Sequence, residues 1–163
     1  MSNLGFDLIM CDQVSLDDEV INRALSILES RIINKGVTIV GSDSAVNFLR
    51  LQLELEEQEI FCVLFMDTKN RVIEFKKMFF GTLRQTSVYP REVVKLALKL
   101  NASSVIISHN HPSGIPEPSI EDRHITKRLS DALNLVDVRI LDHIVIGHGI
   151  SVSFAERGWL PFS

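Results

Sequence analysis

Two continuous apolar segments constrain the fold of this chain most strongly. Ile60–Met66 contains no charged or amide side chain, and Ser103–Ile107 is a second, shorter segment of the same kind. A strand with one face in water alternates apolar and polar residues, whereas these segments do not alternate, so both of their faces must be covered. Segments with helical spacing lie between and around them along the chain. The sequence therefore predicts an α/β domain with helices packed on a central sheet.

The helices are indicated by their start signals and by apolar spacing. Ser15 with its acidic first turn, Gly41–Asp43, Tyr89–Pro90 and Ser119 each precede a segment in which apolar residues recur at helical intervals. The first helix is expected to end at Gly36, and the second runs into the acidic stretch 54–59, which we interpret as a solvated end with a turn. The expected buried residues of the last two helices are Val93, Val94, Ala97, Leu98 and Leu100, then Ile125, Leu129, Ala132 and Leu133.

The remaining strands complete a mixed sheet. They are expected at Val37–Val40, Arg71–Phe80, Val136–Ile146 and Ile150–Ser153, and the turn Asp67–Asn70 precedes the second of them. The chain shows no internal repeat, no low-complexity segment and no linker long enough to divide it. We therefore expect an N-terminal arm and helix over residues 1–36 and one α/β domain over residues 37–163.

Charge and cysteine usage bear on partners and compartment. Seventeen Lys+Arg against twenty-one Asp+Glu give a formal net charge of −4, so no general basic field attracts nucleic acid. Cys11 and Cys62 are isolated, as expected for reduced thiols in the cytosol. No segment approaches the roughly 20 apolar residues of a membrane span, and no signal peptide is evident. The expectation is a cytoplasmic protein that has no membrane partner and little support for binding DNA.

The residues that carry chemistry gather in Ser108–Gly114 and at the helix start that follows. His109 and His111 are two apart, so in an extended segment both rings project to the same side. Asp122 follows after ten intervening residues, in the first turn of the next helix. Two imidazoles and a carboxylate are a natural ligand set for Zn²⁺ that leaves the fourth position to water. The pattern alone is weak, because surface histidines beside prolines are common and helix capping explains the Asp.

Several neighbouring polar residues have more than one interpretation. Ser119 can be the helix N-cap, or its hydroxyl can also face the metal and stabilise an oxyanion. His124 is expected to be solvated, and His148, between two glycines, to lie in a turn. His143 lies in an apolar strand, where it fits a hydrogen-bonded core residue behind the site better than a ligand. Asp142 could orient one of the ligand histidines.

The segment His109–Gly114, with Pro118–Ser119 and Asp122, resembles the JAMM (JAB1/MPN/Mov34) metalloprotease motif. Other segments of the chain are similar to the bacterial RadC-like branch of that superfamily, in its short form without the N-terminal helix-hairpin-helix domain. The resemblance covers roughly residues 20 to 160. The additional similar segments are Leu64–Asp67, Asn70–Arg71, Gly81–Thr82, Tyr89–Glu92, Leu141–His143 and Gly158.

This resemblance implies a fold, a metal and a chemistry. The implied fold is a cytidine-deaminase-like α/β/α sandwich with a mixed sheet, preceded by a short helical extension. Carried over to this sequence, the zinc ligands would be His109, His111 and Asp122, and the oxyanion-stabilising hydroxyl would be that of Ser119. The implied activity is zinc-dependent hydrolysis of a peptide or isopeptide bond in a peptide or protein substrate.

The general base is where this sequence departs from the family pattern. Members of this branch place a Glu on an earlier strand, and alignment on Gly81–Thr82 puts Lys76 at that position. Glu74 is two residues earlier, about 6–7 Å along an ideal strand, and a slip or bulge could let it substitute. The plainer interpretation of Glu74 is an exposed strand residue. Binding zinc and cleaving an amide are separable, because only cleavage needs a base within hydrogen-bond reach of the water.

Three functions therefore remain open from the sequence. The first is a zinc metallohydrolase in which Glu74 supplies the base. The second is a metal-binding pseudoenzyme or interaction module, in which Lys76 leaves the site without a base. The third is a DNA-binding protein associated with DNA repair, although no helix-hairpin-helix segment is expected in the 59 residues before Ile60.

Overall fold

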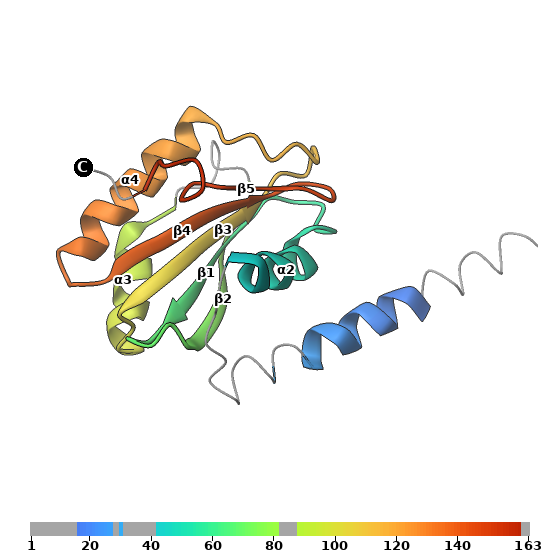
Figure 1. Cartoon of the computed structure of the whole chain (residues 1–163), viewed down its shortest axis with the longest axis horizontal. Helices are drawn as coiled ribbons and strands as arrows, with labels where there is room; N and C mark the ends of the chain where they lie inside the picture. Colours follow the sequence, from blue (N-terminus) through green and yellow to red (C-terminus); the bar gives the residue numbers. More distant parts are fainter. Residues whose placement is uncertain (1–15, 28–29, 31–41, 82–87, 161–163) are drawn as a thin grey trace, which may run out of the picture.

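A mixed five-stranded sheet forms the centre of the protein (Figure 1). The strand order is β2-β1-β3-β4-β5. Only the β3–β4 pair is parallel, and the other neighbouring pairs are antiparallel. The strands are β1 (Ile60–Met66), β2 (Val72–Phe80), β3 (Ser104–Asn110), β4 (Arg139–Ile146) and β5 (Ser151–Ser153).

Helices cover both faces of the sheet and produce the α/β/α sandwich that the sequence predicted. The structure, a computed structural model, describes residues 16–27, 30, 42–81 and 88–160. Helix α2 (Ser42–Leu53) packs on one face, and α3 (Pro90–Lys99) and α4 (Ile120–Asn134) pack on the other (Figure 1). A further helix over residues 16–27 extends away from the sheet in Figure 1. Within the described ranges, no helix is long and apolar enough to cross a membrane.

The position of strand β1 at the centre of the protein explains why its sequence is apolar without interruption. All seven of its residues are buried, as predicted. Alternation sends Phe61, Val63 and Phe65 into the core beneath α3 and α4. The residues between them, among them Cys62 and Leu64, enter the core beneath α2, so that neither face of the strand is left for a polar side chain. Burial raises the pKa of the Cys62 thiol well above its usual range, so this cysteine is an inert core residue.

Strand β3 is longer than the sequence indicated. The apolar pattern ends at Ile107, where we expected a polar loop, yet the strand continues through Asn110 and its last residues are buried. The extension is possible because both neighbours supply partners: His109 is in register with Phe61 of β1 and with Val145 of β4. The first histidine of the motif therefore belongs to the rigid sheet and not to a loop.

Other element boundaries also differ from the sequence predictions. In α3 the buried face consists of Val93 and Ala97, whereas Leu98 is 52 % exposed because it lies about 100° further around the helix. Strand β4 begins three residues later than expected because Asp137 has a positive φ of 59°, which ends the preceding turn. Val37–Val40 and Cys11 lie outside the described residues.

Hydrogen bonds of the Asn110 side chain connect the end of β3 to the segment between α2 and β1. Its Oδ1 accepts a hydrogen bond from the Ile60 backbone N–H at 2.7 Å. Its Nδ2 donates to the backbone oxygens of Glu56 at 3.2 Å and Gln58 at 3.0 Å. The side chain is 2 % exposed, so water does not replace these bonds if it is removed. The central residue of the His-Asn-His segment therefore has a structural role.

We expect Asn110→Ala to lower the free energy of unfolding by about 1–3 kcal/mol, since it leaves buried backbone groups without partners. Urea unfolding followed by circular dichroism measures this loss. Asn134→Ala is the matched control, because Asn134 is exposed at the end of α4. Equal effects of the two substitutions would contradict the role assigned to Asn110.

Candidate metal centre

His109, His111 and Asp122 converge at the end of the sheet where β3 stops and α4 begins. The Nε2 atoms of the two histidines are 3.0 Å apart. Asp122 Oδ1 lies 3.2 Å from His109 Nε2, and Asp122 Oδ2 lies 3.5 Å from His111 Nε2. Among the described residues, these three side chains form the group whose possible ligand atoms lie close enough together to hold a metal ion. The structure therefore brings together the ligand set that the sequence predicted.

The dimensions of this triangle fit a zinc ion. Zinc binds imidazole nitrogen and carboxylate oxygen at about 2.0–2.2 Å, so two tetrahedral ligands lie roughly 3.3–3.5 Å apart. The nitrogen–nitrogen separation of 3.0 Å is close to that value, and so are the nitrogen–oxygen separations of 3.2 and 3.5 Å, each of which involves a different carboxylate oxygen of Asp122. One ligand atom from each of the three residues lies within 4.8 Å of the others, so the cluster can surround one cation and leave one position open.

Backbone geometry places each of the three side chains. His109 is on β3 and is fully buried, while His111 follows the strand by one residue and its N–H donates to Ile146 O at 2.8 Å. Both rings turn to the same side, as the spacing predicted. The His111 ring is then oriented by a 2.8 Å contact between its Nδ1 and the carbonyl oxygen of Ile115.

Asp122 is fixed by a capping box at the start of α4. The Ser119 hydroxyl accepts a hydrogen bond from Asp122 N at 3.1 Å, and Asp122 Oδ2 accepts one from Ser119 N at 2.6 Å. The Ser119 hydroxyl also donates to Asp122 Oδ2 at 2.8 Å. Ser119 is therefore the helix N-cap, and it contacts the candidate ligand as well.

The negative charge of this cluster is on Asp122, whose carboxylate is buried. Burial alone would raise the pKa of Asp122, but the neighbouring imidazoles of His109 and His111 keep it well below its usual range. The hydrogen bond to Asp122 raises the pKa of His111 above its ordinary value against the opposing effect of burial, and attraction to Glu59 adds to the increase. The site therefore keeps a carboxylate ionised and attracts a positive charge, whether a proton or a metal ion.

This pairing makes the stability of the metal-free protein depend on pH. Because the folded pKa of His111 is raised, its contribution is complete below the unfolded value of 6.5 and is lost as pH rises through the folded value. Asp122, whose pKa is lowered, stays ionised throughout that window. We expect His111→Gln to destabilise the metal-free protein more at about pH 5.5 than at about pH 8.5.

Urea unfolding in the presence of a chelator measures this difference. His124→Gln is the control, because it removes an imidazole from the exposed side of α4, the helix that carries Asp122. A loss for His111→Gln that is equal at both pH values would show that the histidine is not paired with Asp122.

Behind His109 lies a buried line of hydrogen bonds. His109 Nδ1 is 2.8 Å from His143 Nε2, and His143 Nδ1 is 2.6 Å from Thr126 Oγ1. Burial lowers the pKa of His143 well below its usual range, so the ring is neutral. His143 is thus a core residue in contact with a candidate ligand, as predicted. Asp142 instead bonds to Ser153 and to backbone N–H groups.

Comparison with known proteins agrees with this geometry. The RadC-like JAB domain family matches residues 39–159 of the chain. The chain belongs to the RadC-like JAB domain family. Two UPF0758 proteins of Vibrio cholerae are 53 % and 50 % identical over 151 and 144 residues, covering 94 % and 90 % of their own lengths. A UPF0758 protein of Tolumonas auensis is 50 % identical over 142 residues, which is 62 % of its length.

Strand register separates Glu74 from the candidate ligands of this JAB domain. Glu74 pairs with Phe65, which pairs with Val105, four positions along β3 from His109. That is about 13 Å along the strands, and β1 lies between β2 and β3. Lys76 is exposed and in register with Ile107 through β1, two positions from His109. The structure therefore brings together the ligands and Ser119 but leaves Glu74 at a distance.

Glu59 is the acidic residue that the sequence interpretation missed. It precedes β1 by one residue, and its backbone oxygen accepts a hydrogen bond from Gly81 N at 2.8 Å. Strand alternation puts it on the face of Phe61, which is in register with His109. Its charge acts on His111. The signal in the sequence is an acid directly before the buried strand that neighbours the histidine strand, but the acidic stretch 54–59 as a whole resembles a solvated turn.

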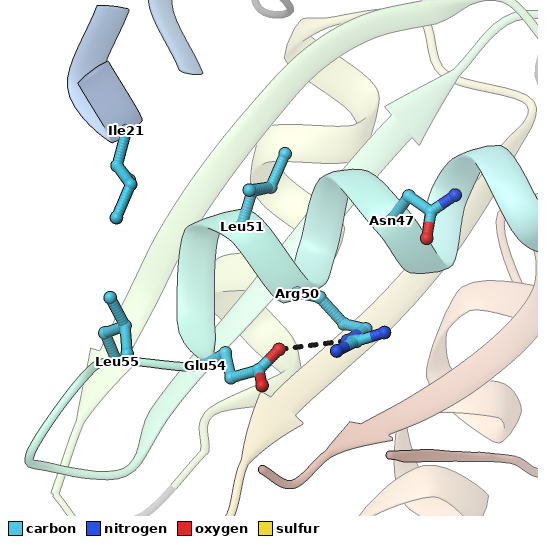
Figure 2. A pocket seen from close by; sticks show the side chains of 6 residues that line it. All are labelled: Ile21, Asn47, Arg50, Leu51, Glu54 and Leu55. Atoms are coloured by element: carbon cyan, nitrogen blue, oxygen red, sulfur yellow. Dashed lines mark hydrogen bonds and ion pairs between the residues drawn. The ribbon is translucent and has the colours of Figure 1, made fainter. Parts of the chain in front are cut away.

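A separate hollow lies between the helix over residues 16–27 and α2, and Figure 2 shows the side chains that line it. Its charged groups are already engaged: Arg50 Nε donates to Glu54 Oε2 at 2.9 Å, and Glu54 Oε1 accepts from Gly149 N at 2.6 Å. The remaining lining residues are Asn47 and the apolar Ile21, Leu51 and Leu55. This hollow offers apolar contact and no ligand set comparable with that of the metal centre.

The two remaining histidines, His124 and His148, lie outside the centre and the hydrogen bonds behind it. His124 is exposed on α4, as predicted. His148 lies in the turn after β4, where its N–H donates to Gly114 O at 3.0 Å. A Cβ atom at Gly114 would come within 2.5 Å of His148 Nδ1, and Gly114 has a φ of 81°. Glycine is therefore required where this turn packs on the loop that follows His111.

Proposed function

We propose that this RadC-like JAB domain is a zinc-dependent hydrolase of peptide or isopeptide bonds. The observation that carries the proposal is the cluster of His109, His111 and Asp122, in which each pair of residues brings a nitrogen or oxygen atom of one within 3.0–3.5 Å of the other, near the ligand spacing of zinc. A site with three protein ligands and one open position is typical of catalytic zinc, whereas structural zinc has four protein ligands. When bound, zinc would lower the pKa of a coordinated water to about 7 and polarise a substrate carbonyl.

We place the general base at Glu59. Its carboxylate acts on His111, and its position before β1 puts it on the sheet face that carries His109. A carboxylate there can accept a proton from the attacking water and return it to the leaving amine. Glu74, which the sequence offered as a substitute for the base at the Lys76 position, is the alternative, and it is displaced by four positions along the strands from His109.

Ser119 is proposed to act on the substrate as well as on the helix. Its hydroxyl lies 2.8 Å from Asp122 Oδ2, at the edge of the ligand cluster. A hydroxyl at this place can donate a hydrogen bond to the oxyanion that develops when an amide carbonyl is attacked. In the absence of substrate the same hydroxyl orients the ligand carboxylate.

We expect the purified protein to bind about one equivalent of zinc, because the structure supplies one set of ligands at the required spacing. His109→Ala and Asp122→Ala should each reduce bound zinc below about a tenth of an equivalent. Inductively coupled plasma mass spectrometry measures the content. His124→Ala is the control and should retain the wild-type amount, and wild-type zinc in the His109→Ala protein would refute the site.

The assignment of the base is tested with Glu59→Gln and Glu74→Gln. We expect Glu59→Gln to reduce kcat by about 10²–10⁴-fold, because it removes proton transfer while zinc still binds. Glu74→Gln should stay close to wild type. Cleavage is assayed with zinc-loaded protein on a panel of peptides and isopeptide-linked peptides.

The outcomes of this assay separate three accounts. Loss of activity in Glu74→Gln alone would move the base to Glu74. If the wild-type protein binds zinc but cleaves no member of the panel, the domain is better described as a metal-binding interaction module. Loss of zinc from Glu59→Gln would show that Glu59 stabilises the centre and would contradict a role confined to proton transfer.

A further inference from the structure

His109 and His111 differ in how their rings are held, although both face the same site. The Nδ1 of His111 meets a backbone carbonyl oxygen, that of Ile115, at 2.8 Å. A carbonyl only accepts hydrogen bonds, so His111 must carry a proton on Nδ1, and Nε2 is the atom that is left to bind a metal. The Nδ1 of His109 instead meets another imidazole, His143, which can either donate or accept. The contact between the two rings therefore does not fix the tautomer of His109.

Thr126 resolves this ambiguity. Its hydroxyl has a single proton, which it donates to the backbone oxygen of Asp122, one turn earlier on α4, at 2.5 Å. The same oxygen atom lies 2.6 Å from His143 Nδ1. Because the hydroxyl proton is already committed, Thr126 accepts here and His143 Nδ1 donates. The neutral ring then has a bare Nε2, which accepts the hydrogen bond from His109 Nδ1.

We propose that Thr126 and His143 are positioning residues that hold His109 in the tautomer able to bind a metal. Hydrogen bonds run from His109 through His143 and Thr126 to the backbone carbonyl of Asp122. That carbonyl belongs to the residue whose carboxylate faces the same metal position. The inference rests on the metal centre proposed above and adds two residues that do not contact the metal.

The side chains of this hydrogen-bond chain are buried, so water cannot replace any of their hydrogen bonds. Thr126, His143 and His109 are each 0 % exposed. Phe61 lies beside both imidazoles, with ring centroids 6.4 Å from His109 and 6.0 Å from His143. Phe154 covers His143 at 4.5 Å. In such an apolar enclosure an imidazole N–H without an acceptor is costly, so the direction of each hydrogen bond depends on the next one.

Thr126→Val tests the proposal because it removes the hydroxyl and keeps the shape of the side chain. His143 would then carry its proton on Nε2 and donate to His109 Nδ1, which would force the His109 proton onto the metal-facing Nε2. We expect zinc affinity, measured by competition with a chromophoric chelator, to fall about 10–100-fold. Thr126→Ser restores the hydroxyl and should bind zinc like wild type. Ser130→Ala, which removes another buried hydroxyl from α4, is the matched control.

The tautomers themselves provide a readout that a purely structural role would not change. Long-range ¹H–¹⁵N spectra should show the proton of His143 on Nδ1 in the metal-free protein, and a proton on Nδ1 of His109 in the zinc-loaded protein. In Thr126→Val the His143 proton should move to Nε2. A wild-type His143 protonated on Nε2, or a Thr126→Val protein with unchanged tautomers and unchanged zinc affinity, would overturn the proposal.

The experiment also separates this inference from the proposed function. Wild-type protein that takes up no zinc would refute the metal centre, yet the tautomers of the metal-free protein would still decide the role of Thr126. If Thr126→Val does not fold, the wild-type tautomers decide the direction of the hydrogen bonds. A loss of zinc affinity in Thr126→Ser as large as 10-fold would count against the hydroxyl as the anchor.

Discussion

The buried carboxylate of Asp122 is the group on which the site depends. It is 1 % exposed, and a charge in such a place must be compensated by hydrogen bonds and opposite charge. Ser119 supplies hydrogen bonds from its backbone and its hydroxyl, while His109 and His111 face the two carboxylate oxygens. The start of α4, the end of β3 and the loop after it are thereby joined at one point. A divalent cation would satisfy the same charge more completely, which is why the geometry that stabilises the metal-free fold also suits a metal.

The sheet makes this arrangement rigid. β1 is buried on both faces and pairs with β2 and β3, so that the strand carrying His109 has partners on each side. Asn110 ties the chain before β1 to the end of β3, which holds Glu59 near the ligands. Behind the ligands, Thr126 and His143 connect α4 to β4 and β3. The residues that face the candidate metal thus rest on regular elements, and a second group of buried polar residues supports them.

Much of this could be predicted from the sequence, for reasons that differ between residues. The unbroken apolar segment at Ile60–Met66 reports burial on both faces, because hydrophobic periodicity is a direct consequence of the environment of a strand. The ligand set followed from residue chemistry and spacing. The role of Thr126 could not be predicted, since a threonine inside a helix gives no sign of which strand its hydroxyl meets. Glu59 and Glu74 could not be distinguished either, because that choice depends on cross-strand register and on the bulges between β1 and β2.

The most direct test of the metal centre is anomalous diffraction at the zinc edge from crystals of the zinc-loaded protein. One peak is expected about 2.0–2.2 Å from Nε2 of His109, Nε2 of His111 and one carboxylate oxygen of Asp122. Nδ1 of His109 should still face His143. No peak among these three residues, or zinc bound through Nδ1 of either histidine, would refute the metal centre.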